Sequence, residues 1–387
     1  MKNIMLTGKS CCGCRGCEQA CPQKCVTFFT DKEGFLYPEV DETRCTECGV
    51  CLKKCPVYTK AECGKSPKVF AAKIKDKQTA FGSTSGGVFT AVAEHILDNG
   101  GVVYGCAFDE SLTARHIAVE SKAELQRLRS SKYVQSDLSG VFSALKKELK
   151  NGRQVLFSGT GCQCAGLKNF LGRDYDNLIL TDIVCHGVPS PLLFEKYLEY
   201  KGSKMGGKIT AYNFRSKEKR GWDLYYKAET AGTSKSDYGF FDPYYNAFLN
   251  CKTYRESCYV CKYANSSRTG DITLADYWGI EKFHPSFYDS NGVSLVLVNT
   301  DKGERLWQEL APVLESIPSE LEKAVVMNKN LKEPSSRPEC RDGIYDGIDG
   351  DINRYFETKL AFKINPKTKL KKAIPLGIKN AVKKIKS

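Results

Sequence analysis

Two copies of one cysteine spacing constrain this chain more than any other feature of its sequence. The pattern C-x2-C-x2-C-x3-C-P runs from Cys11 to Pro22 and recurs from Cys45 to Pro56. In bacterial two-cluster ferredoxins with this spacing, three cysteines of each run bind one [4Fe-4S] cluster and the fourth binds the other. The spacing therefore predicts a ferredoxin domain over residues 1–62 with two ligand sets, which are Cys11, Cys14, Cys17 and Cys55, and Cys21, Cys45, Cys48 and Cys51.

Other uses of these cysteines are less consistent with the pattern. Structural zinc sites pair C-x2-C knuckles around one tetrahedral ion, and a run of four cysteines does not suit a single ion. A cytoplasmic location is expected, because residues 1–10 lack an apolar signal segment and no run is apolar for long enough to span a bilayer. Disulfides are disfavoured there. Cys12, Cys25 and Cys63 lie outside the pattern and are expected to be small buried hydrophobes.

The net charge of +13 is concentrated at the end of the 387-residue chain. Residues 363–386 contain nine lysines and no acid, so a uniformly basic nucleic-acid surface is not indicated and no nucleic-acid partner is expected. Apolar residues recur among these lysines at every third or fourth position, namely Leu370, Ile374, Ile378, Val382 and Ile385. The pattern suggests peripheral contact with the inner face of a membrane. Pro375 and Gly377 weaken a helix there, and a solvated tail is the alternative.

Residues from about 66 to 330 alternate between strand and helix patterns, which predicts a mixed α/β body. We expect a hairpin over 26–40, strands over 69–72, 101–108 and 114–119, and helices over 88–97, 122–129 and 138–149. The helix from Val88 follows Ser85-Gly86-Gly87, where free N–H groups can bind a cofactor phosphate. An ordinary N-cap and tight turn is the alternative. The polar loop 130–135 is a further candidate for phosphate or ring contact.

Two strand–loop–helix units predict parallel strands over 155–157 and 178–184, followed by helices to 171 and over 192–200. Cys162 and Cys185 then lie at the carboxyl ends of those strands, where open α/β sheets place ligands. With the C-x2-C pair Cys258 and Cys261 they suffice for a third [4Fe-4S] cluster. Zinc is the alternative metal, because C-x2-C suits it equally well.

Several further residues have open roles. Cys251 and Cys164 are alternative ligands at this third site. His186, beside Cys185, is a weak catalytic candidate, because a histidine next to a ligand more often orients it. His95 and His116 are expected to be surface or satisfied core histidines. Residues 271–279 form a strand that ends in an acid and aromatics, which can line a flat-ring pocket or belong to the core, and 293–299 is an internal strand.

Five ordered motifs carry a family resemblance: Ser85 to Ala91, Ser131 to Asp137, Gly159 to Gln163, Cys185 to Ser190, and the Cys258/Cys261 pair before Ala275 to Gly279. Together they resemble the coenzyme F420 hydrogenase/dehydrogenase beta-subunit family, in its bacterial form with a fused N-terminal two-cluster ferredoxin domain. The resemblance covers nearly all of residues 1–330. One departure is Gly161, which stands where the family has proline.

The resemblance implies the division 1–62, 66–150, 151–330 and 331–387, in which the second and third segments form one FAD-binding α/β body with its own cluster. Ser85, Gly86, Gly87, Lys132, Tyr133 and Gly159 become FAD-contact candidates. The implied function is an iron–sulfur flavoenzyme that reduces or oxidises a small organic substrate, possibly deazaflavin-like, with a ferredoxin or partner subunit as electron donor or acceptor. The alternatives are a non-catalytic electron-transfer subunit, which could serve a surface-polysaccharide pathway, and a regulatory protein with structural clusters.

Overall fold

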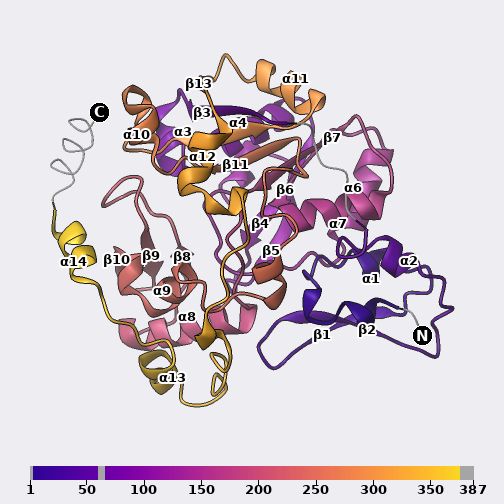
Figure 1. Cartoon of the computed structure of the whole chain (residues 1–387), viewed down its shortest axis with the longest axis horizontal. Coiled ribbons are helices and arrows are strands. Elements are labelled where there is room, and N and C mark those ends of the chain that lie inside the picture. Colours follow the sequence, from indigo (N-terminus) through magenta and orange to yellow (C-terminus); the bar gives the residue numbers. More distant parts are fainter. Residues whose placement is uncertain (1–2, 60–65, 375–387) are drawn as a thin grey trace.

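The N-terminal ferredoxin module is a hairpin flanked by short helices, shown in indigo in Figure 1. The computed structural model describes residues 3–59 and 66–374 of the chain. Strands β1 and β2 pair antiparallel from Val26↔Val40 to Thr30↔Leu36, as the sequence predicts. The tight turn between them forms around Asp31, whose carboxylate accepts the N–H groups of Glu33 and Phe35. The elements of this module are η1(Ile4–Ser10), α1(Gly16–Ala20), β1(Val26–Thr30), β2(Leu36–Val40) and α2(Val50–Lys53).

The body is built on one eight-stranded mixed sheet with the order β13-β3-β12-β11-β7-β6-β4-β5. Its centre, β4-β6-β7-β11, is parallel, and the outer pairs are antiparallel. Strands from 66–150 and from 151–330 thus share one sheet, and every residue of β12 is buried. The strands are β3(Lys68–Ile74), β4(Val102–Phe108), β5(Ala114–Val119), β6(Val155–Thr160), β7(Leu178–Ile183), β11(Ile272–Asp276), β12(Ser294–Val298) and β13(Leu314–Ser319).

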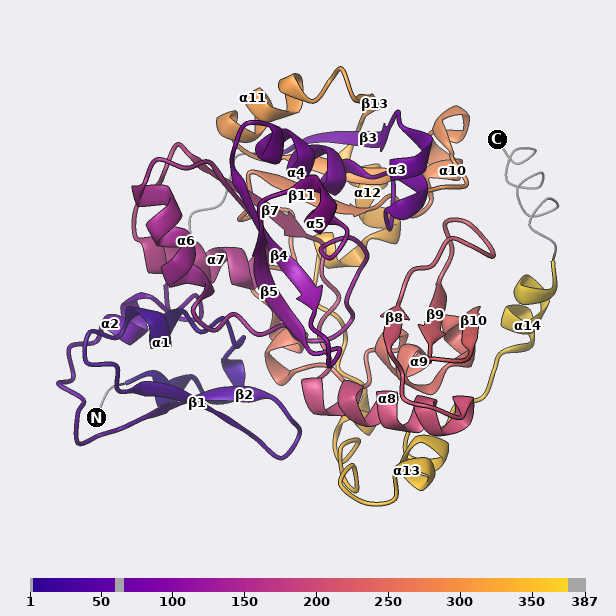
Figure 2. The ribbon, with the colours of Figure 1, turned by 180° about the vertical axis from the view of Figure 1, so that it is seen from behind.

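Helices cover both faces of this sheet because alternate strand residues are apolar on each side. One face packs against α3, α4, α5 and α11, and the other packs against α6, α7, α10 and α12 (Figures 1 and 2). These helices are α3(Lys77–Gly82), α4(Val88–Asp98), α5(Lys122–Leu125), α6(Val141–Lys150), α7(Gly161–Leu171), α10(Ile280–Phe283), α11(Asp301–Glu309) and α12(Leu321–Met327). The helix expected over 122–129 ends early at Leu125, because the N–H groups of Arg127 and Leu128 bind the carbonyls three residues before them, as in turns. The Lys132 ammonium binds the carbonyls of residues 127–130 that follow.

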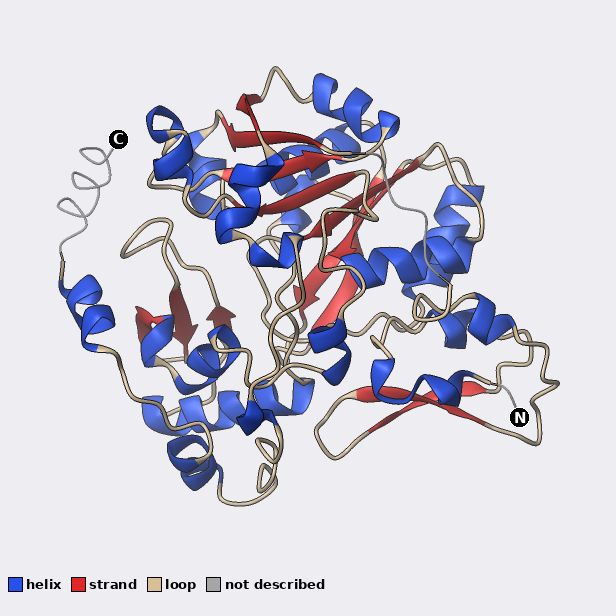
Figure 3. Ribbon diagram, viewed as in Figure 1, coloured by secondary structure: helices blue, strands red, loops and turns tan. Residues whose placement is uncertain are grey.

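A smaller unit with an aromatic core lies beside the sheet (Figure 3). Its strand order is β10-β9-β8, and the core also takes in Phe35 and Tyr37 from the ferredoxin hairpin. The unit and its connections comprise α8(Pro191–Met205), β8(Ala211–Asn213), β9(Tyr225–Glu229), β10(Ser234–Tyr238), η2(Gly239–Phe241), α9(Pro243–Leu249), η3(Glu256–Val260), η6(Glu339–Arg341) and α13(Ile352–Thr358). The short helices η4(Pro285–Phe287) and η5(Lys329–Leu331) instead pack with α10 and α12 on the large sheet.

Helix α14(Pro366–Ala373) lies against this smaller unit. Arg220 donates to the carbonyls of Lys372 and Ile374, and the Lys372 ammonium pairs with Asp237 at 2.5 Å. Ile378, Val382 and Ile385 of the predicted apolar stripe lie outside the described residues, as does Cys63. Within the described ranges, the chain has no helix with the length and apolar character that crossing a membrane requires.

Candidate iron–sulfur sites and flavin region

The two cysteine loops of the ferredoxin module repeat the same backbone turn. Gly13 (φ 71°) and Glu47 (φ 51°) precede the second cysteine of each run, and Arg15 (φ 57°) and Gly49 (φ 70°) follow it. Left-handed backbone is costly for a residue with a side chain, so surrounding contacts must hold it. Arg15 is held by an ion pair with Asp137 at 3.0 Å. The paired left-handed residues turn each loop between its first and third cysteines.

The structure brings together the two sets of four cysteines that the spacing assigns. Cys11, Cys14, Cys17 and Cys55 are all buried, and their thiols interact electrostatically; we call this the proximal site. Cys21 instead lines a pocket with Cys45, Cys48 and Cys51, which we call the distal site. The fourth cysteine of each run therefore crosses to the other loop, as predicted. That these thiols bind iron stays a prediction.

The third set of cysteines also converges, at the carboxyl ends of β6 and β7. Cys162 lies in the first turn of α7, Cys185 follows β7, and η3 and the residue after it supply Cys258 and Cys261. Burial and the neighbouring thiols Cys185 and Cys162 raise the pKa of Cys258, and burial raises that of Cys185 to about 12. We call these four residues the third site.

The alternative ligands are engaged elsewhere. The Cys164 thiol lies 3.7 Å from the Thr181 carbonyl inside the packing of α7 on the sheet. The Cys251 thiol lies beside the Tyr254 hydroxyl, and the Cys251 carbonyl accepts the Tyr259 hydroxyl at 2.6 Å. Their positions favour the set predicted from Cys162, Cys185, Cys258 and Cys261.

The chemistry of these donor sets fits an iron–sulfur cluster. A thiol binds metal as the thiolate, and buried thiolates need compensating positive charge. Iron atoms supply that charge, and in a cubane the four thiolates are spread over four separate irons. Within residues 3–59 and 66–374, no three His, Cys, Asp or Glu side chains are grouped so as to hold one metal ion.

Cys12 connects the proximal and third sites. Its buried thiol lies beside that of Cys14 on one side and that of Cys162 on the other. The sequence predicts only a buried hydrophobe here, because the adjacency depends on how the ferredoxin module docks on α7. That docking is close: a Cβ on Gly166 of α7 would lie 2.8 Å from the Cys14 sulfur.

Arg255 fixes the same interface through the backbone of the cysteine loop. Its guanidinium donates to the carbonyl of Cys11 at 2.6 Å, to the side-chain oxygen of Gln135 at 3.1 Å and to the carbonyl of Leu36 at 2.8 Å. The Gln135 amide in turn donates to the carbonyl of Cys12 at 3.2 Å. Because Arg255 lies three residues before Cys258, one side chain links the loops of two sites.

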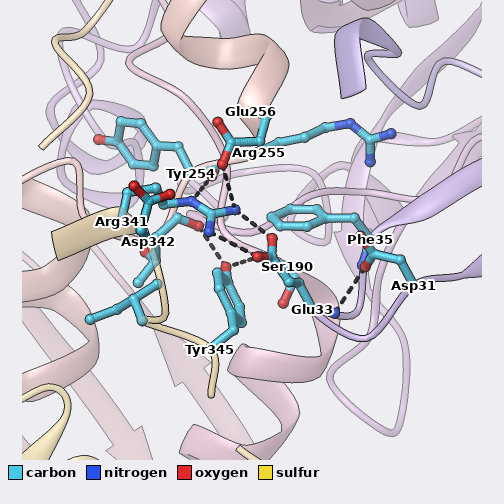
Figure 4. Close-up of polar contacts among 12 residues, drawn as sticks. Asp31, Glu33, Phe35, Ser190, Tyr254, Arg255, Glu256, Arg341, Asp342 and Tyr345 are labelled. Atoms are coloured by element: carbon cyan, nitrogen blue, oxygen red, sulfur yellow. Dashed lines mark hydrogen bonds and ion pairs between the residues drawn. The ribbon is translucent and has the colours of Figure 1, made fainter. Parts of the chain in front are cut away.

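A second buried arginine anchors the tip of the hairpin (Figure 4). Arg341 forms a two-pronged ion pair with Glu33 at 2.5 and 3.0 Å and donates to the carbonyl of Tyr254. Beside it, Gly34 packs so closely on α8 that a Cβ there would lie 2.2 Å from the Leu192 Cβ. The ferredoxin module is therefore held at its cysteine loop and at its hairpin turn.

The glycines before α4 have a packing role. A Cβ on Gly86 would lie 2.4 Å from the Ala72 carbonyl oxygen and 2.7 Å from the Ser294 nitrogen, so its small size is already required by β3 and β12. The Ser85 hydroxyl donates to the carbonyl of Val293. Gly87 is the N-cap of α4 and has left-handed backbone (φ 86°); no side chain caps the helix. The first turn of α4 thus keeps N–H groups free of side-chain acceptors.

The other flavin candidates are packed within the chain. Burial lowers the pKa of Lys132 to about 8, and its ammonium donates to four backbone carbonyls. The Tyr133 ring stacks on Phe248 at 4.3 Å. A Cβ on Gly159 would lie 2.9 Å from the Phe157 ring.

The segment Arg215 to Lys217 links these separated candidates and is absent from the sequence prediction. Lys217 donates to the carbonyl of Ser85 at 2.9 Å, and burial lowers its pKa to about 7. Arg215 donates to the Tyr133 hydroxyl at 3.2 Å and pairs with Asp276, at the end of β11, at 2.6 Å. Nothing in the local sequence marks these cations, since their partners come from distant elements.

Aromatic rings and a histidine complete this region. Asp276 also accepts the Trp222 indole N–H at 2.7 Å, and Trp222 stacks on Trp278 with ring centroids 5.0 Å apart. The carbonyl of His186 accepts the Ser335 hydroxyl at 2.6 Å, and burial lowers the pKa of His186, with Asp276 as its acidic neighbour. The region therefore combines cations with flat rings, which suits a large planar anion.

Comparisons with known proteins agree with the motifs. Residues 69–143 match the model for the coenzyme F420 hydrogenase/dehydrogenase beta subunit N-terminus, and 152–318 match that for its C-terminus. Residues 10–59 match a 4Fe-4S dicluster domain. Among solved structures, a chain of the F420-reducing [NiFe] hydrogenase complex from Methanosarcina barkeri is similar, at 16% identity over 70% of this chain and 88% of that one, with a TM-score of 0.49. No curated protein sequence matches the chain.

Proposed function

Because the chain belongs to the coenzyme F420 hydrogenase/dehydrogenase beta-subunit family, we propose that it is an FAD-dependent oxidoreductase that exchanges electrons between its iron–sulfur sites and a small organic substrate. As an iron–sulfur member of this family, it is an electron-transfer protein. A flavin, when bound, takes up two electrons as a hydride and releases them singly. Such a group suits a protein in which one-electron carriers serve an organic substrate.

One observation carries the proposal: the distal, proximal and third sites form a continuous series within one chain. The distal site includes the exposed Cys48, which suits exchange with an external donor. Cys17 interacts electrostatically with Cys51 of the distal site, and Cys12 lies beside both Cys14 and Cys162. The chain's own loops therefore hold all twelve predicted ligands in an order that leads from the surface into the α/β body.

The region around the first turn of α4 supports the flavin part of the proposal. Free N–H groups at the start of a helix favour an anion such as a pyrophosphate. Lys217 adds a buried amine donor beside Ser85, and Arg215 adds a cation between Tyr133 and Asp276. We propose that these residues, together with Lys132 and Gly159, orient the FAD, and that His186 lies near its reactive ring.

The test is anaerobic purification of the full chain followed by iron, sulfide, zinc and flavin analysis. We expect three clusters and one FAD per chain, and flavin that dithionite-reduced clusters can reduce. Deazaflavin and other organic acceptors are then added to the reduced protein. Clusters without flavin would indicate a non-catalytic electron-transfer subunit, and stoichiometric zinc would contradict the third cluster.

A further inference from the structure

Arg255 is a fully buried cation whose polar partners are all neutral. Its side chain is 0% exposed, and its three hydrogen bonds end on the carbonyls of Cys11 and Leu36 and on the amide of Gln135. The guanidinium also lies 4.1 Å from the centroid of the Tyr37 ring. Among the residues that the structure describes, no carboxylate forms an ion pair with Arg255.

Other buried arginines of this protein each form an ion pair with a carboxylate, which Arg255 lacks. Arg341, which is 1% exposed, pairs with Glu33, and Arg268 pairs with Asp182 at 3.0 Å. Arg215 pairs with Asp276 at 2.6 Å. Burying a charge is costly unless an opposite charge accompanies it. The negative partner of Arg255 must therefore come from something other than a described carboxylate.

The surroundings of Arg255 indicate where that negative charge lies. A Cβ on Gly13, between Cys11 and Cys14, would lie 3.5 Å from the Arg255 guanidinium, so the cation packs directly against the proximal loop. On its other side, the Arg255 carbonyl accepts the N–H of Cys258 at 2.9 Å. Four thiolates outweigh the positive charge of a cubane core, so a loaded site is anionic. The site whose loop the guanidinium contacts directly is the proximal one.

We propose that Arg255 is the counter-charge of the proximal cluster, a positioning residue that raises the reduction potential of that cluster above what the cysteines alone would give. This inference rests on the proposed iron–sulfur function. Reduction adds one electron and makes the site more negative, so a nearby cation in a medium of low dielectric constant stabilises the reduced form. An electron that reaches the distal site then favours the proximal one, beside Cys12 and the third site.

The test compares three variants of the full chain in redox titrations followed by electron paramagnetic resonance. Arg255→Gln removes the charge but keeps a hydrogen-bonding side chain, and Arg255→Lys keeps the charge without the planar fork. Arg341→Gln is the matched control, because it removes another interface arginine that has its own carboxylate partner. Iron and sulfide are counted for each variant.

In Arg255→Gln we expect the equilibrium constant for reducing the proximal cluster to fall about tenfold, which is about 59 mV for a one-electron couple. The distal signal is expected to stay at the wild-type potential in every variant, and Arg255→Lys and Arg341→Gln are expected to keep all three potentials. An unchanged Arg255→Gln, or equal shifts in the Gln and Lys variants, would overturn the proposal.

Loss of the proximal cluster from Arg255→Gln is also decisive. If Arg255→Lys retains it, the charge itself is needed to hold an anionic cluster, and the proposal stands. If both variants lose it while Arg341→Gln keeps it, the fork geometry is what matters, and the counter-charge is refuted. Failure of the proposed function has a different signature, because the wild-type protein would then lack clusters or flavin altogether.

Discussion

Cys258 is the residue on which the third site can be tested most directly. Replacing Cys258 with serine removes a thiolate whose neighbours are Cys185 and Cys162, and a serine hydroxyl is a poorer ligand for iron. We expect the iron and sulfide content of Cys258→Ser to fall by one cluster's worth, while the paramagnetic signals of the ferredoxin module persist.

Cys251→Ser provides the matched control for that prediction. Cys251 lies seven residues earlier in the same segment, and its backbone carbonyl rather than its thiol makes the contact with Tyr259. Its replacement is expected to leave the iron content unchanged. If Cys251→Ser loses the cluster and Cys258→Ser does not, the ligand assignment is wrong although the site remains.

The buried histidine His116 is expected to make the free energy of unfolding depend on pH. It is buried, accepts from the Ser136 hydroxyl at Nδ1 and donates from Nε2 to the carbonyl of Ser158, as a neutral ring would. Burial lowers its pKa to about 4 from an ordinary value of 6.5. Between those values the unfolded state binds more protons, so the free energy of unfolding must fall as the pH drops from 6.5 to 4, by up to about 3 kcal/mol.

The variant His116→Gln should flatten that decline, because glutamine cannot take up the proton. Denaturant unfolding at a series of pH values between 4 and 7 measures the slopes. His95→Gln is the control for replacing a histidine elsewhere in the chain, since His95 lies on α4 beside Glu309 and has no contact with His116. Parallel slopes for wild-type protein and His116→Gln would rule out this histidine as the cause.

At the scale of elements, helix α7 is the surface on which the ferredoxin module docks. Gly166 faces Cys14, and a Cβ added at Gly166 would lie only 2.8 Å from the Cys14 sulfur, which is too close for the loop to keep its position. A valine there must displace the proximal loop from Cys162. We therefore expect Gly166→Val to lose the proximal cluster or to abolish electron transfer from the module to the body, as judged by iron content and stopped-flow reduction.

Gly232, in the turn between β9 and β10, is the matched position for this substitution, because a Cβ there meets no atom within 4 Å. Gly232→Val is expected to behave like the wild-type protein in both measurements. Wild-type iron content and transfer rate in Gly166→Val would show that the module does not depend on α7.

The start of α4 tests the flavin placement. Gly86 is unsuitable, because any side chain there strikes β3 and β12 whether or not a cofactor binds. Thr84 is half-buried in the same loop, and an acid near a helix N-terminus does not harm the helix. We expect Thr84→Asp to repel the FAD pyrophosphate and weaken flavin binding at least about tenfold, while the isosteric Thr84→Asn retains flavin. Equal flavin content in the two variants would contradict the placement.

The elements also show how far the sequence could predict this protein. The crossover of Cys21 and Cys55 and the pairing of β6 with β7 follow from local spacing, so they were predicted and agree with the structure. The smaller sheet was not predicted, because its strands are short and are stabilised by an aromatic core assembled from distant segments.

The residues of the candidate site also fall into those that local sequence patterns predict and those that they do not. The four cysteines of the third site could be named from two strand ends and a C-x2-C pair, since sheet topology brings those ends together. Arg255, Cys12 and Arg215 could not be named, because their partners lie in other elements and no local pattern marks a buried cation. The early end of α5 could not be predicted, because the chain after Leu125 continues in turns whose N–H groups bind the carbonyls three residues before them.

For the whole molecule, the double anchoring of the ferredoxin module bears on how electrons move. Arg341 holds the hairpin turn and Arg255 the cysteine loop, so the module packs on the body as a fixed part rather than as a tethered carrier. A buried ion pair or buried hydrogen-bonded cation at each end makes separation costly. Transfer into the body should therefore follow first-order kinetics that do not depend on protein concentration.

The basic tail makes a second prediction for the whole molecule. Residues 366–374 contact the smaller unit through Arg220 and Asp237, so they are not free to lie on a membrane. Any attachment to anionic vesicles must come from residues 375–387, which contain four lysines. Each lysine contributes about 1 kcal/mol near an anionic surface, and salt screens this attraction. We expect the full chain to sediment with phosphatidylglycerol vesicles at low salt and to be released at high salt.

Two truncations separate the contributions of the tail. A chain that ends at Ile374 keeps α14 and its contacts, whereas one that ends at Phe362 loses both. If residues 375–387 provide the membrane contact, the two truncated chains lose vesicle binding to the same extent, because both lack these residues and Lys372 of α14 pairs with Asp237 of the protein itself. Retained binding by the chain ending at Ile374 alone would place the contact on α14, and undiminished binding by both would exclude the tail.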